Sequence, residues 1–424
     1  MRLGSGPPVR RADASAQDDV RRANLSAVLR LLHFHGPATR SDLVASTGFN
    51  RSTVGSLTSE LVKLGLVRER PGEVRGKGRP SNVVEPVSTS AHVLAFDVTT
   101  STVGAARVGL GGYMLQMRRR LHSAPPHDVP AVVELIATLV AEMQARAHPA
   151  SVCLGIAVSV PGSVRQPDGL VRRSPPLGWY EVHLADLLRD AIGDDVPITV
   201  GNDGDLGVVA EYLRGAARGE RDVLYVRGEA GVAGGVVVDG ELLKGSGGYA
   251  GEVGHLLVKP GGRLCSCGAK GCWEAEVGDA AVIRSVGRDP RESDIEDVIN
   301  DVAVGNRRAI AGVRKTGEWV GLGLASLVNI FNPRIVVLGG TIGALYPTME
   351  ATLVQGYART LGPNREQALL VRSELASDAQ LVGAAEVAFA DALEDPAGTL
   401  DARRGTGGEN DEPAQVHELR ALGS

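Results

Sequence analysis

Three cysteines crowd one short segment of this chain in a pattern that suits metal binding. Cys265, Cys267 and Cys272 lie within eight positions, and His255 precedes the first of them by ten residues. Three thiolates and one imidazole form a tetrahedral set of zinc ligands, and the glycines between the cysteines allow the loop to fold back on an ion. Because protein ligands then fill all four positions, we expect one structural zinc ion rather than a hydrolytic centre.

A disulfide is the alternative for two of these cysteines. The first twenty residues mix Arg, Asp, Gly and Pro without an apolar core segment, so no secretory signal is predicted and we expect a cytoplasmic location. Disulfides are rare in that compartment, and the clustered thiols are odd in number, which favours the metal site. Cys153 lies in the apolar run 152–158 and is interpreted as a core residue.

Acidic and amide side chains recur beside glycines elsewhere in the chain. Gly201-Asn202-Asp203 and Gly251-Glu252-Val253-Gly254-His255 are two such blocks, Val160-Pro161-Gly162 follows a predicted strand, and the cysteine segment ends at Glu274. Together these blocks resemble the ROK family (repressors, open reading frames and sugar kinases), from about residue 25 to residue 393. The resemblance implies an α/β protein with the two-lobed, actin-like and ribonuclease-H-like sugar kinase fold.

The same resemblance implies a sugar site. The residues that correspond to the sugar contacts of the family's kinases are Asn202, Asp203, Glu252, His255 and Glu274. Carboxylates accept hydrogen bonds from sugar hydroxyls, and a missing hydroxyl would leave a buried acceptor unpaired, which is a source of specificity. Taken singly, each acidic residue suits a surface group or a helix cap as well. Their clustering around glycines and the cysteine loop favours binding of a sugar or sugar phosphate.

The segments that would bind ATP phosphates depart from the family pattern. Kinases of the family use an Asp-x-Gly-Gly-Thr turn, because glycine allows backbone N–H groups to approach the phosphates. Here the turn reads Asp97-Val98-Thr99-Thr100-Ser101, and the second loop, normally Gly-Thr-Gly, reads Glu229-Ala230-Gly231. Asp203, which corresponds to the proton acceptor of the kinases, is retained. We therefore expect sugar binding without phosphoryl transfer, with no catalytic residue and with Asp203 as a vestigial base.

One further block differs from the family. The pattern Pro-Asn-Leu-x-Gly-Trp reads here Pro175-Pro176-Leu177-Gly178-Trp179. The missing Asn puts one sugar contact in doubt, so the ligand is not assumed to be that of the glucose-type relatives.

The N-terminal region predicts a DNA-binding unit. Apolar spacing predicts a helix over 24–32, a capped helix over 40–46 and, after the tight turn 47–50, a third helix over 51–64. The third helix is apolar on one face, and the side chains that we expect at the DNA major groove are Arg51, Ser52, Thr53 and Ser56. A small helical protein-interaction domain is the alternative.

A wing is expected after the third helix. Residues 65–67 and 82–84 predict a short hairpin around Gly76-Lys77-Gly78-Arg79-Pro80, from which Lys77 and Arg79 could reach a narrow minor groove. Residues 1–90 hold 14 Lys and Arg against 8 Asp and Glu, so this end is basic although the whole chain carries a net charge of -5. A basic end joined to an acidic body favours a phosphate backbone as the partner of the N-terminal unit.

These observations predict the following domains. The segments are a disordered tail at 1–20, a winged helix-turn-helix at 21–86, a first α/β lobe at 87–200 completed by about 378–393, a second α/β lobe with the zinc loop at 201–377, and a disordered tail at 394–424. No apolar stretch comes near the roughly 18 residues of a membrane span, so no membrane contact is expected.

The helix-turn-helix is further similar to the repressor branch of the family, which includes the N-acetylglucosamine and xylose repressors. We therefore predict a sugar-responsive transcription regulator that binds double-stranded operator DNA as a homodimer or homotetramer and represses carbohydrate uptake or metabolism genes. Two alternatives stay open. One is an active ATP-dependent sugar kinase with an appended DNA-binding domain, and the other is a DNA-binding protein controlled by a protein partner.

Overall fold

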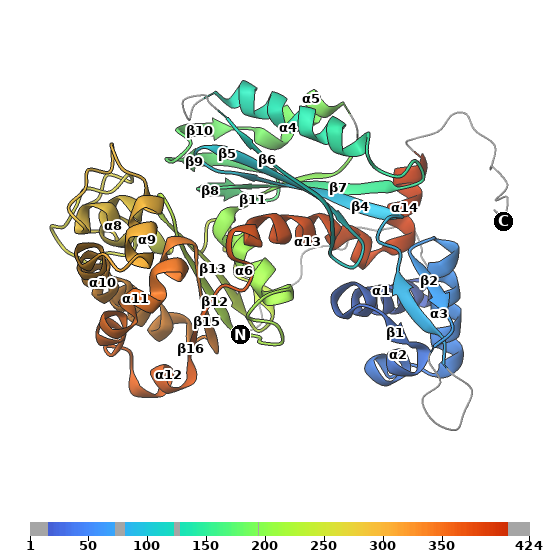
Figure 1. Cartoon of the computed structure of the whole chain (residues 1–424). Helices are drawn as coiled ribbons and strands as arrows, with labels where there is room; N and C mark the ends of the chain where they lie inside the picture. Colours follow the sequence, from blue (N-terminus) through green and yellow to red (C-terminus); the bar gives the residue numbers. More distant parts are fainter. Residues whose placement is uncertain (1–15, 73–80, 123–127, 194, 406–424) are drawn as a thin grey trace, which may run out of the picture.

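The computed structural model describes residues 16–72, 81–122, 128–193 and 195–405. Three bodies lie in a row, namely a small N-terminal unit, a first α/β lobe and a second α/β lobe (Figure 1). Among the described residues, no helix combines the length and apolarity needed to cross a membrane. The mixed α/β architecture with helices beside two main sheets confirms the predicted fold class.

The N-terminal unit is a winged helix. Its elements are α1 (Ala16–His35), β1 (Ala38–Thr39), α2 (Arg40–Thr47), α3 (Arg51–Lys63), β2 (Val67–Arg70) and β3 (Val83–Pro86). The strands form an antiparallel sheet in the order β1-β3-β2. Thr39 begins α2 in a capping box with Asp42, and the Asn50 side chain accepts the Thr53 backbone N–H at 2.8 Å to begin α3. These caps satisfy backbone donors that each helix start leaves unpaired, so the predicted helix starts are confirmed.

The first lobe is built on a five-stranded sheet in the order β11-β7-β4-β5-β6. Its elements are β4 (Ala91–Val98), β5 (Thr102–Gly109), β6 (Tyr113–Leu121), α4 (Val129–Gln144), β7 (Val152–Val160), α5 (Leu184–Ile192) and β11 (Ile198–Asn202). A small second sheet consists of β8 (Ser163–Arg165), β9 (Leu170–Ser174) and β10 (Trp179–Val182). Leu94 and Phe96 of β4 pack toward α4 and α5, whereas Val93 and Ala95 pack toward α13 (Ala379–Glu394). The central strand is therefore buried on both faces.

The second lobe has a sheet in the order β14-β13-β12-β15-β16. The elements from here to the second lobe's end are α6 (Asp203–Leu213), β12 (Val223–Gly228), β13 (Val232–Val238), β14 (Glu241–Leu242), η1 (Val253–His255), α7 (Trp273–Val277), α8 (Asp279–Ser285), α9 (Ile295–Ala303), α10 (Arg307–Phe331), β15 (Ile335–Gly339), α11 (Gly340–Tyr357), α12 (Gly362–Gln367), β16 (Leu369–Arg372) and η2 (Ala376–Asp378). Leu224 and Val226 of β12 face the α10 and α11 side, while Val223 and Tyr225 face α6.

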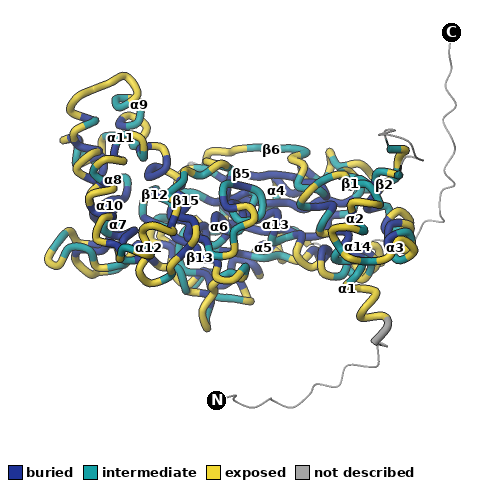
Figure 2. The backbone as a smooth tube through the Cα atoms, turned by 90° about the horizontal axis from the view of Figure 1, so that it is seen from below, coloured by how far each residue is buried: buried dark blue, intermediate teal, exposed yellow. Residues whose placement is uncertain are grey.

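Helix α13 lies at the centre of the molecule. Its buried residues follow the inner face of the first sheet, and the helix passes α6 at one end and α1 at the other (Figures 1 and 2). Helix α13 therefore contacts both the cleft-side helix α6 and the winged helix.

Three predicted boundaries are wrong. Helix α1 begins at Ala16, inside the tail predicted at 1–20, because Asp18 and Asp19 favour a helix N-terminus and Arg21 pairs with Glu60 of α3 at 2.7 Å. The sheet of the first lobe extends past 200, since β11 stays paired with β7 as far as Asn202.

The third correction concerns the tail predicted at 394–424. Residues 396–405 form α14 (Pro396–Gly405), which packs its apolar side on the core through Leu400, only 1% exposed. Arg403 donates to the Cys153 carbonyl at 3.0 Å and Arg404 to the Leu64 carbonyl at 3.1 Å. The sequence prediction relied on the polar composition of this segment and overlooked the apolar residue Leu400, through which α14 packs on the core.

Candidate functional site

A cavity of about 470 Å³ lies between the two lobes. All five predicted sugar contacts line it, namely Asn202, Asp203, Glu252, His255 and Glu274. They come from the start of α6, from η1 and from the start of α7, segments far apart in the chain. The fold thus brings the predicted acceptors to one place.

Asn202 and Asp203 stand where β11 passes into α6. The Asn202 side-chain oxygen caps α6 by accepting the backbone N–H groups of Gly204 at 2.8 Å and Asp205 at 3.1 Å. Its amide group donates to the Gly162 carbonyl at 2.8 Å and to the Asp203 carboxylate at 3.2 Å. The hydrogen bonds of Asn202 therefore hold the turn and orient Asp203.

Asp203 is a buried acid that lines the cavity. Only 5% of the residue is exposed, and burial raises the pKa of its carboxyl to about 7 although the Arg227 guanidinium opposes that shift. Arg227 Nη1 lies 3.2 Å from Asp203 Oδ2 and 2.7 Å from a Glu229 carboxylate oxygen. Sequence reasoning missed Arg227. The sequence signal that could have found it is an arginine at the end of an apolar strand, two residues before the segment predicted as the second phosphate loop.

Glu252 precedes the short helix η1, and His255 is the last residue of that helix. Glu252 accepts a hydrogen bond from the Ser163 hydroxyl at 2.6 Å, a contact from the first lobe that sequence reasoning also missed. The His255 Nε2 atom lies 3.9 Å from Glu252 Oε2, while Nδ1 points toward the cysteines. The two ring nitrogens of His255 therefore face two different neighbours.

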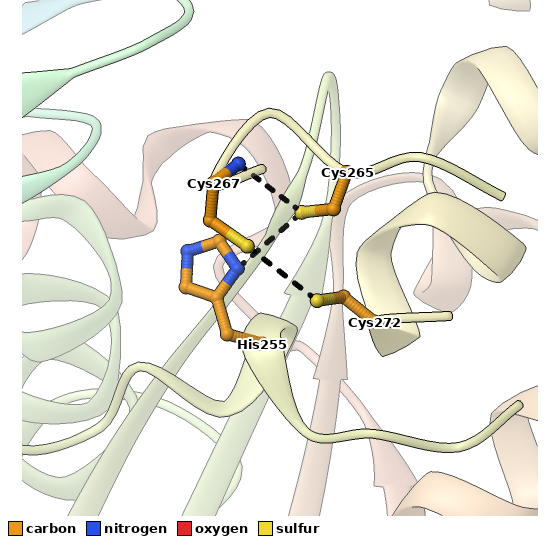
Figure 3. Close-up of side chains that lie close together, drawn as sticks. All are labelled: His255, Cys265, Cys267 and Cys272. Carbon is orange, nitrogen blue, oxygen red and sulfur yellow. Dashed lines mark hydrogen bonds between the residues drawn. The ribbon is translucent and has the colours of Figure 1, made fainter. Parts of the chain in front are cut away.

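The ligand atoms of His255, Cys265, Cys267 and Cys272 converge (Figure 3). All four lie within 4.8 Å of one another, with Cys267 Sγ 3.6 Å from Cys272 Sγ and Cys265 Sγ 3.5 Å from His255 Nδ1. A tetrahedral ion with metal–sulfur bonds of about 2.3 Å has edges of about 3.8 Å, so the spacing fits such an ion. These four residues could hold a metal ion.

The thiols differ in their electrostatic surroundings. Burial raises the pKa of the Cys265 and Cys272 thiols, whereas the Ala269 backbone N–H lowers the pKa of Cys267. A metal binds thiolates and releases their protons, so a bound cation would supply the charge that keeps the buried thiols ionised.

Glu274 is in contact with this cluster. Its carboxylate accepts hydrogen bonds from Cys265 Sγ and from the Ser266 hydroxyl, each at 2.9 Å. The neighbouring Trp273 is fully buried and donates its indole N–H to the Trp319 carbonyl at 2.9 Å, which anchors α7 to α10. The cysteine loop and this anchor together hold Glu274 at the cavity wall.

The two segments predicted to be altered phosphate loops also line this cavity. Thr99 and Thr100 contribute from the first lobe, and Glu229, Ala230 and Gly231 from the second. Pro175 and Pro176, which stand at the changed proline block, line it as well. Both predicted loops and the proline block therefore lie at the cavity.

The predicted DNA-reading residues lie on the exposed side of α3. Arg51, Ser52 and Ser56 are exposed and Thr53 is half-buried, while the apolar stripe packs on α1 and α2. Lys77 and Arg79 lie outside the described residues. The flanking strands β2 and β3 pair as predicted, and Glu85 of β3 pairs with Arg68 at 2.6 Å and with Arg70 at 3.0 Å.

A buried polar cluster joins the winged helix to the first lobe, and sequence reasoning missed it. His33 of α1 is fully buried, and its Nε2 lies 2.9 Å from a Glu386 carboxylate oxygen of α13. Arg214 binds the other Glu386 oxygen at 2.7 Å and donates to the His33 carbonyl at 2.9 Å. Burial acts to raise the pKa of Glu386, but His33 and Arg214 outweigh it and hold the pKa below its ordinary value.

This chain is similar to known proteins in sequence and in structure. Residues 94–390 match the ROK family. The chain is 26% identical over 382 residues to the xylose repressor of Bacillus subtilis, covering 88% of this chain and 97% of that repressor. It is 28% identical over 316 residues to the glucokinase of Streptomyces coelicolor, covering 70% of this chain and 96% of the glucokinase.

A solved structure shows the same arrangement over nearly the whole chain. The crystal structure of a ROK family transcriptional regulator, a homolog of the E. coli MLC protein, aligns with a TM-score of 0.74 at 25% identity and covers 91% of this chain and 99% of its own. The ROK hexokinase of Thermus thermophilus aligns with a TM-score of 0.58 at 30% identity and covers 71% of this chain. Since the family match spans well over half of the 424 residues, this protein belongs to the ROK family.

Proposed function

We propose that this protein is a sugar-responsive, DNA-binding transcription regulator that represses genes for carbohydrate uptake or metabolism. The observation that carries the proposal is the cavity, in which sugar-type acceptors converge while threonines and a carboxylate stand at the phosphate loops. The similarity to the xylose repressor supports it, because that match extends over 88% of the chain whereas the glucokinase match covers 70%. The additional length accords with an N-terminal DNA-binding unit.

Three carboxylates and one imidazole would recognise the sugar. Asp203, Glu252 and Glu274 accept hydrogen bonds from hydroxyls, and His255 Nε2 donates one when Nδ1 is held by a metal. Asn202 acts mainly by capping α6 and orienting Asp203. This division of roles follows from the hydrogen bonds that Asn202 already makes in the fold.

We propose zinc as the ion of the cysteine site. Three sulfur ligands and one nitrogen at tetrahedral spacing suit zinc, which supplies a fixed cross-link rather than chemistry here. His255 and the cysteines would hold it, and the loop they close carries the Ser266 hydroxyl that supports Glu274. The metal would therefore help to position Glu274 in the sugar site without contacting the sugar.

Phosphoryl transfer is disfavoured by the loops. Thr99 and Thr100 place β-branched side chains where a glycine turn would let backbone N–H groups reach phosphates. Glu229 adds a negative charge on the same side, which opposes nucleotide phosphates. The proposed function is therefore ligand sensing without turnover.

Helix α13 offers a path from the sugar to the DNA. The Gln380 side chain donates to the Asp203 carbonyl at 3.2 Å, and Glu386 binds His33 of α1. The Ser26 hydroxyl donates to the Leu393 carbonyl at 2.6 Å, near the end of α13. A change in lobe closure would thus tilt α1, and in a homodimer or homotetramer it would change the spacing of two α3 helices on operator DNA.

The test uses DNA selected from a random pool by the purified, zinc-loaded protein. Fluorescence anisotropy should show tight binding to the selected duplex and a shift in affinity on adding xylose, glucose or another sugar of a panel. Arg51→Ala should weaken DNA binding by about 1–3 kcal/mol, because Arg contacts to base edges have that value. Arg314→Ala, an exposed cation on α10, is the control and should leave DNA binding unchanged. Absence of any selected DNA would contradict the proposal.

The active kinase is the second candidate, since the glucokinase similarity and the retained Asp203 favour it. Its test is sugar-dependent formation of ADP from ATP, which Asp203→Asn should abolish. Turnover in the wild type would establish the kinase and remove the sensing-only function. DNA binding that no sugar alters would instead favour control by a protein partner.

A further inference from the structure

Arg227 lines the cavity, and neither the family pattern nor the predicted sugar contacts assign it a role. It stands on β12 next to the phosphate-loop segment, and its side chain is only 11% exposed. The guanidinium lies between two carboxylates, 3.2 Å from Asp203 and 2.7 Å from Glu229. Both acids line the cavity; Asp203 is a predicted sugar contact, and Glu229 belongs to the segment predicted as the second phosphate loop.

We propose that Arg227 is a positioning residue for sugar binding, which holds Asp203 as an ionised and oriented acceptor for a ligand hydroxyl. The inference rests on the proposed function, because it requires the cavity to bind a sugar. It deepens that function because it assigns the ionisation and orientation of Asp203 to one buried cation. The same cation also connects Asp203 to Glu229, in the segment predicted as a phosphate loop.

The surroundings of Asp203 explain why a cation is needed. The carboxylates of Asp97 on β4, Glu229 after β12, Glu252 before η1 and Asp205 on α6 act on it, and Arg227 is the cation that opposes them. Burial and like charge both favour the protonated form of a carboxyl group. A protonated Asp203 would offer one donor and fewer acceptor positions to a sugar, so its hydrogen-bonding pattern would change.

Arginine suits this position better than lysine would. Its guanidinium stays charged even when buried, and its planar group can bind two carboxylates at once. The Arg227 alkyl chain also packs closely against the backbone of Gly340, where an added Cβ would lie 3.0 Å from Arg227 Cγ. The side chain is therefore held in place on one side while its charged end bridges the two acids.

The bridge also affects the basicity of Asp203. A general base must accept a proton from the attacking hydroxyl, and its efficiency depends on its own basicity. Arg227 lowers the basicity of Asp203 relative to the same buried carboxyl without a cation, and the ion pair fixes the direction of its acceptor oxygens. The ion pair therefore orients Asp203 for a ligand hydroxyl.

The experiment first identifies a ligand by a thermal-shift panel of neutral mono- and disaccharides on the zinc-loaded full chain, with D-xylose and D-glucose included. Calorimetry with that sugar then measures affinity between about pH 6 and pH 9, the range around a strongly raised carboxyl pKa. The wild type, Arg227→Met, Arg227→Lys and the control Arg221→Met are compared. Arg221 precedes β12, is 69% exposed and pairs with Asp239, so it stays outside the cavity.

In the wild type, affinity should rise with pH through about 7, where the pKa of Asp203 lies, and then level off. Arg227→Met should weaken binding about tenfold or more at neutral pH, the value of a hydrogen bond to a charged group, and should displace the rise to higher pH. Arg227→Lys should restore part of the affinity because the charge returns. Arg221→Met should follow the wild type.

Three results would overturn the inference. The first is a sugar affinity of Arg227→Met that equals that of the wild type. The second is a loss of sugar affinity in Arg227→Met that is the same at every pH, which would indicate a merely structural role. Zinc content and melting temperature are measured on each variant, and Arg227→Lys provides the readout if Arg227→Met does not fold. A wild type that no sugar stabilises would contradict the proposed function together with this inference, whereas the other two results would leave the proposed function intact.

Discussion

At the scale of single residues, the cysteine cluster shows how closely spaced ligands can be recognised from sequence. Cys265, Cys267 and Cys272 are neighbours in the chain, and glycines between them permit the fold-back that the structure shows. His255 comes from η1 and reaches the cluster with Nδ1, which leaves Nε2 on the cavity side. The same residue can therefore serve the metal and the ligand with different atoms.

The metal site yields the first prediction. Cys272→Ser should reduce bound zinc from about one ion per chain to near zero and lower the melting temperature by about 5–10 °C, because metal binding contributes folding free energy. Atomic absorption and a thermal melt check both effects. Cys153→Ala is the matched control, since Cys153 lies in β7 outside the cluster. Full zinc content in Cys272→Ser would contradict the ligand assignment.

At the scale of elements, the two ends of the described chain show the effect of single packing positions. Helix α14 has a polar surface, yet Leu400 is buried and two arginines donate to carbonyl groups of β7 and of the α3 end. Helix α1 likewise begins before its apolar repeat, and Arg21 near its start forms a surface ion pair with Glu60 of α3. Polar composition is therefore a weak guide to disorder when a neighbouring core offers one apolar site.

The second prediction concerns α14. Leu400→Ala should lower the free energy of unfolding by roughly 2–5 kcal/mol, as expected for a large side chain removed from a well-packed core. Urea denaturation followed by fluorescence measures the change. Asp401→Ala, an exposed neighbour on the same helix, should change stability by less than about 0.5 kcal/mol. Equal effects of the two substitutions would mean that α14 does not pack in solution.

At the scale of the whole molecule, α13 connects the parts whose coupling the proposed function requires. About 20 Å of helix axis separates Gln380, which contacts the Asp203 backbone, from Leu393, which contacts α1. Between them Glu386 binds His33 and Arg214 in a buried cluster. The winged helix is thus attached to the body by specific buried hydrogen bonds as well as by apolar packing.

The third prediction tests this connection. Glu386→Gln should lower the free energy of unfolding by roughly 3–5 kcal/mol, because it leaves buried partners without their counter-charge. It should also reduce the effect of sugar on DNA affinity while each ligand still binds. Denaturation and anisotropy titrations check the two effects, with the exposed Glu394→Gln as the control. Unchanged coupling in Glu386→Gln would exclude this cluster as the path.

The pH dependence of that stability loss follows from the lowered pKa of Glu386. A carboxyl whose native pKa is depressed contributes its full stabilisation above the unfolded value and loses it as the pH falls through the native value. The difference between the wild type and Glu386→Gln should therefore be constant above about pH 5 and shrink below the ordinary value of 4.5. A difference that grows in acid would contradict the assigned role.

The sequence by itself determined the local features of this protein. Helix caps, the apolar repeat of α3 and the strand runs depend on neighbours along the chain, so their positions were predicted within a few residues. The cysteine loop and the acidic blocks were found for the same reason, since each motif is short and continuous. Residues that are close together in one motif must also lie close together in space, so a local pattern is enough to predict that they meet.

Only the tertiary structure decided which distant residues meet. Arg227 of β12 reaches Asp203 at the start of α6, Ser163 reaches Glu252 from the other lobe, and His33 meets Glu386 from the opposite end of the chain. These pairs depend on how sheets and helices stack, and no local periodicity encodes that stacking. Since burial sets the strength of a charge pair, the same distant contacts also decided which of the acidic residues have shifted pKa values.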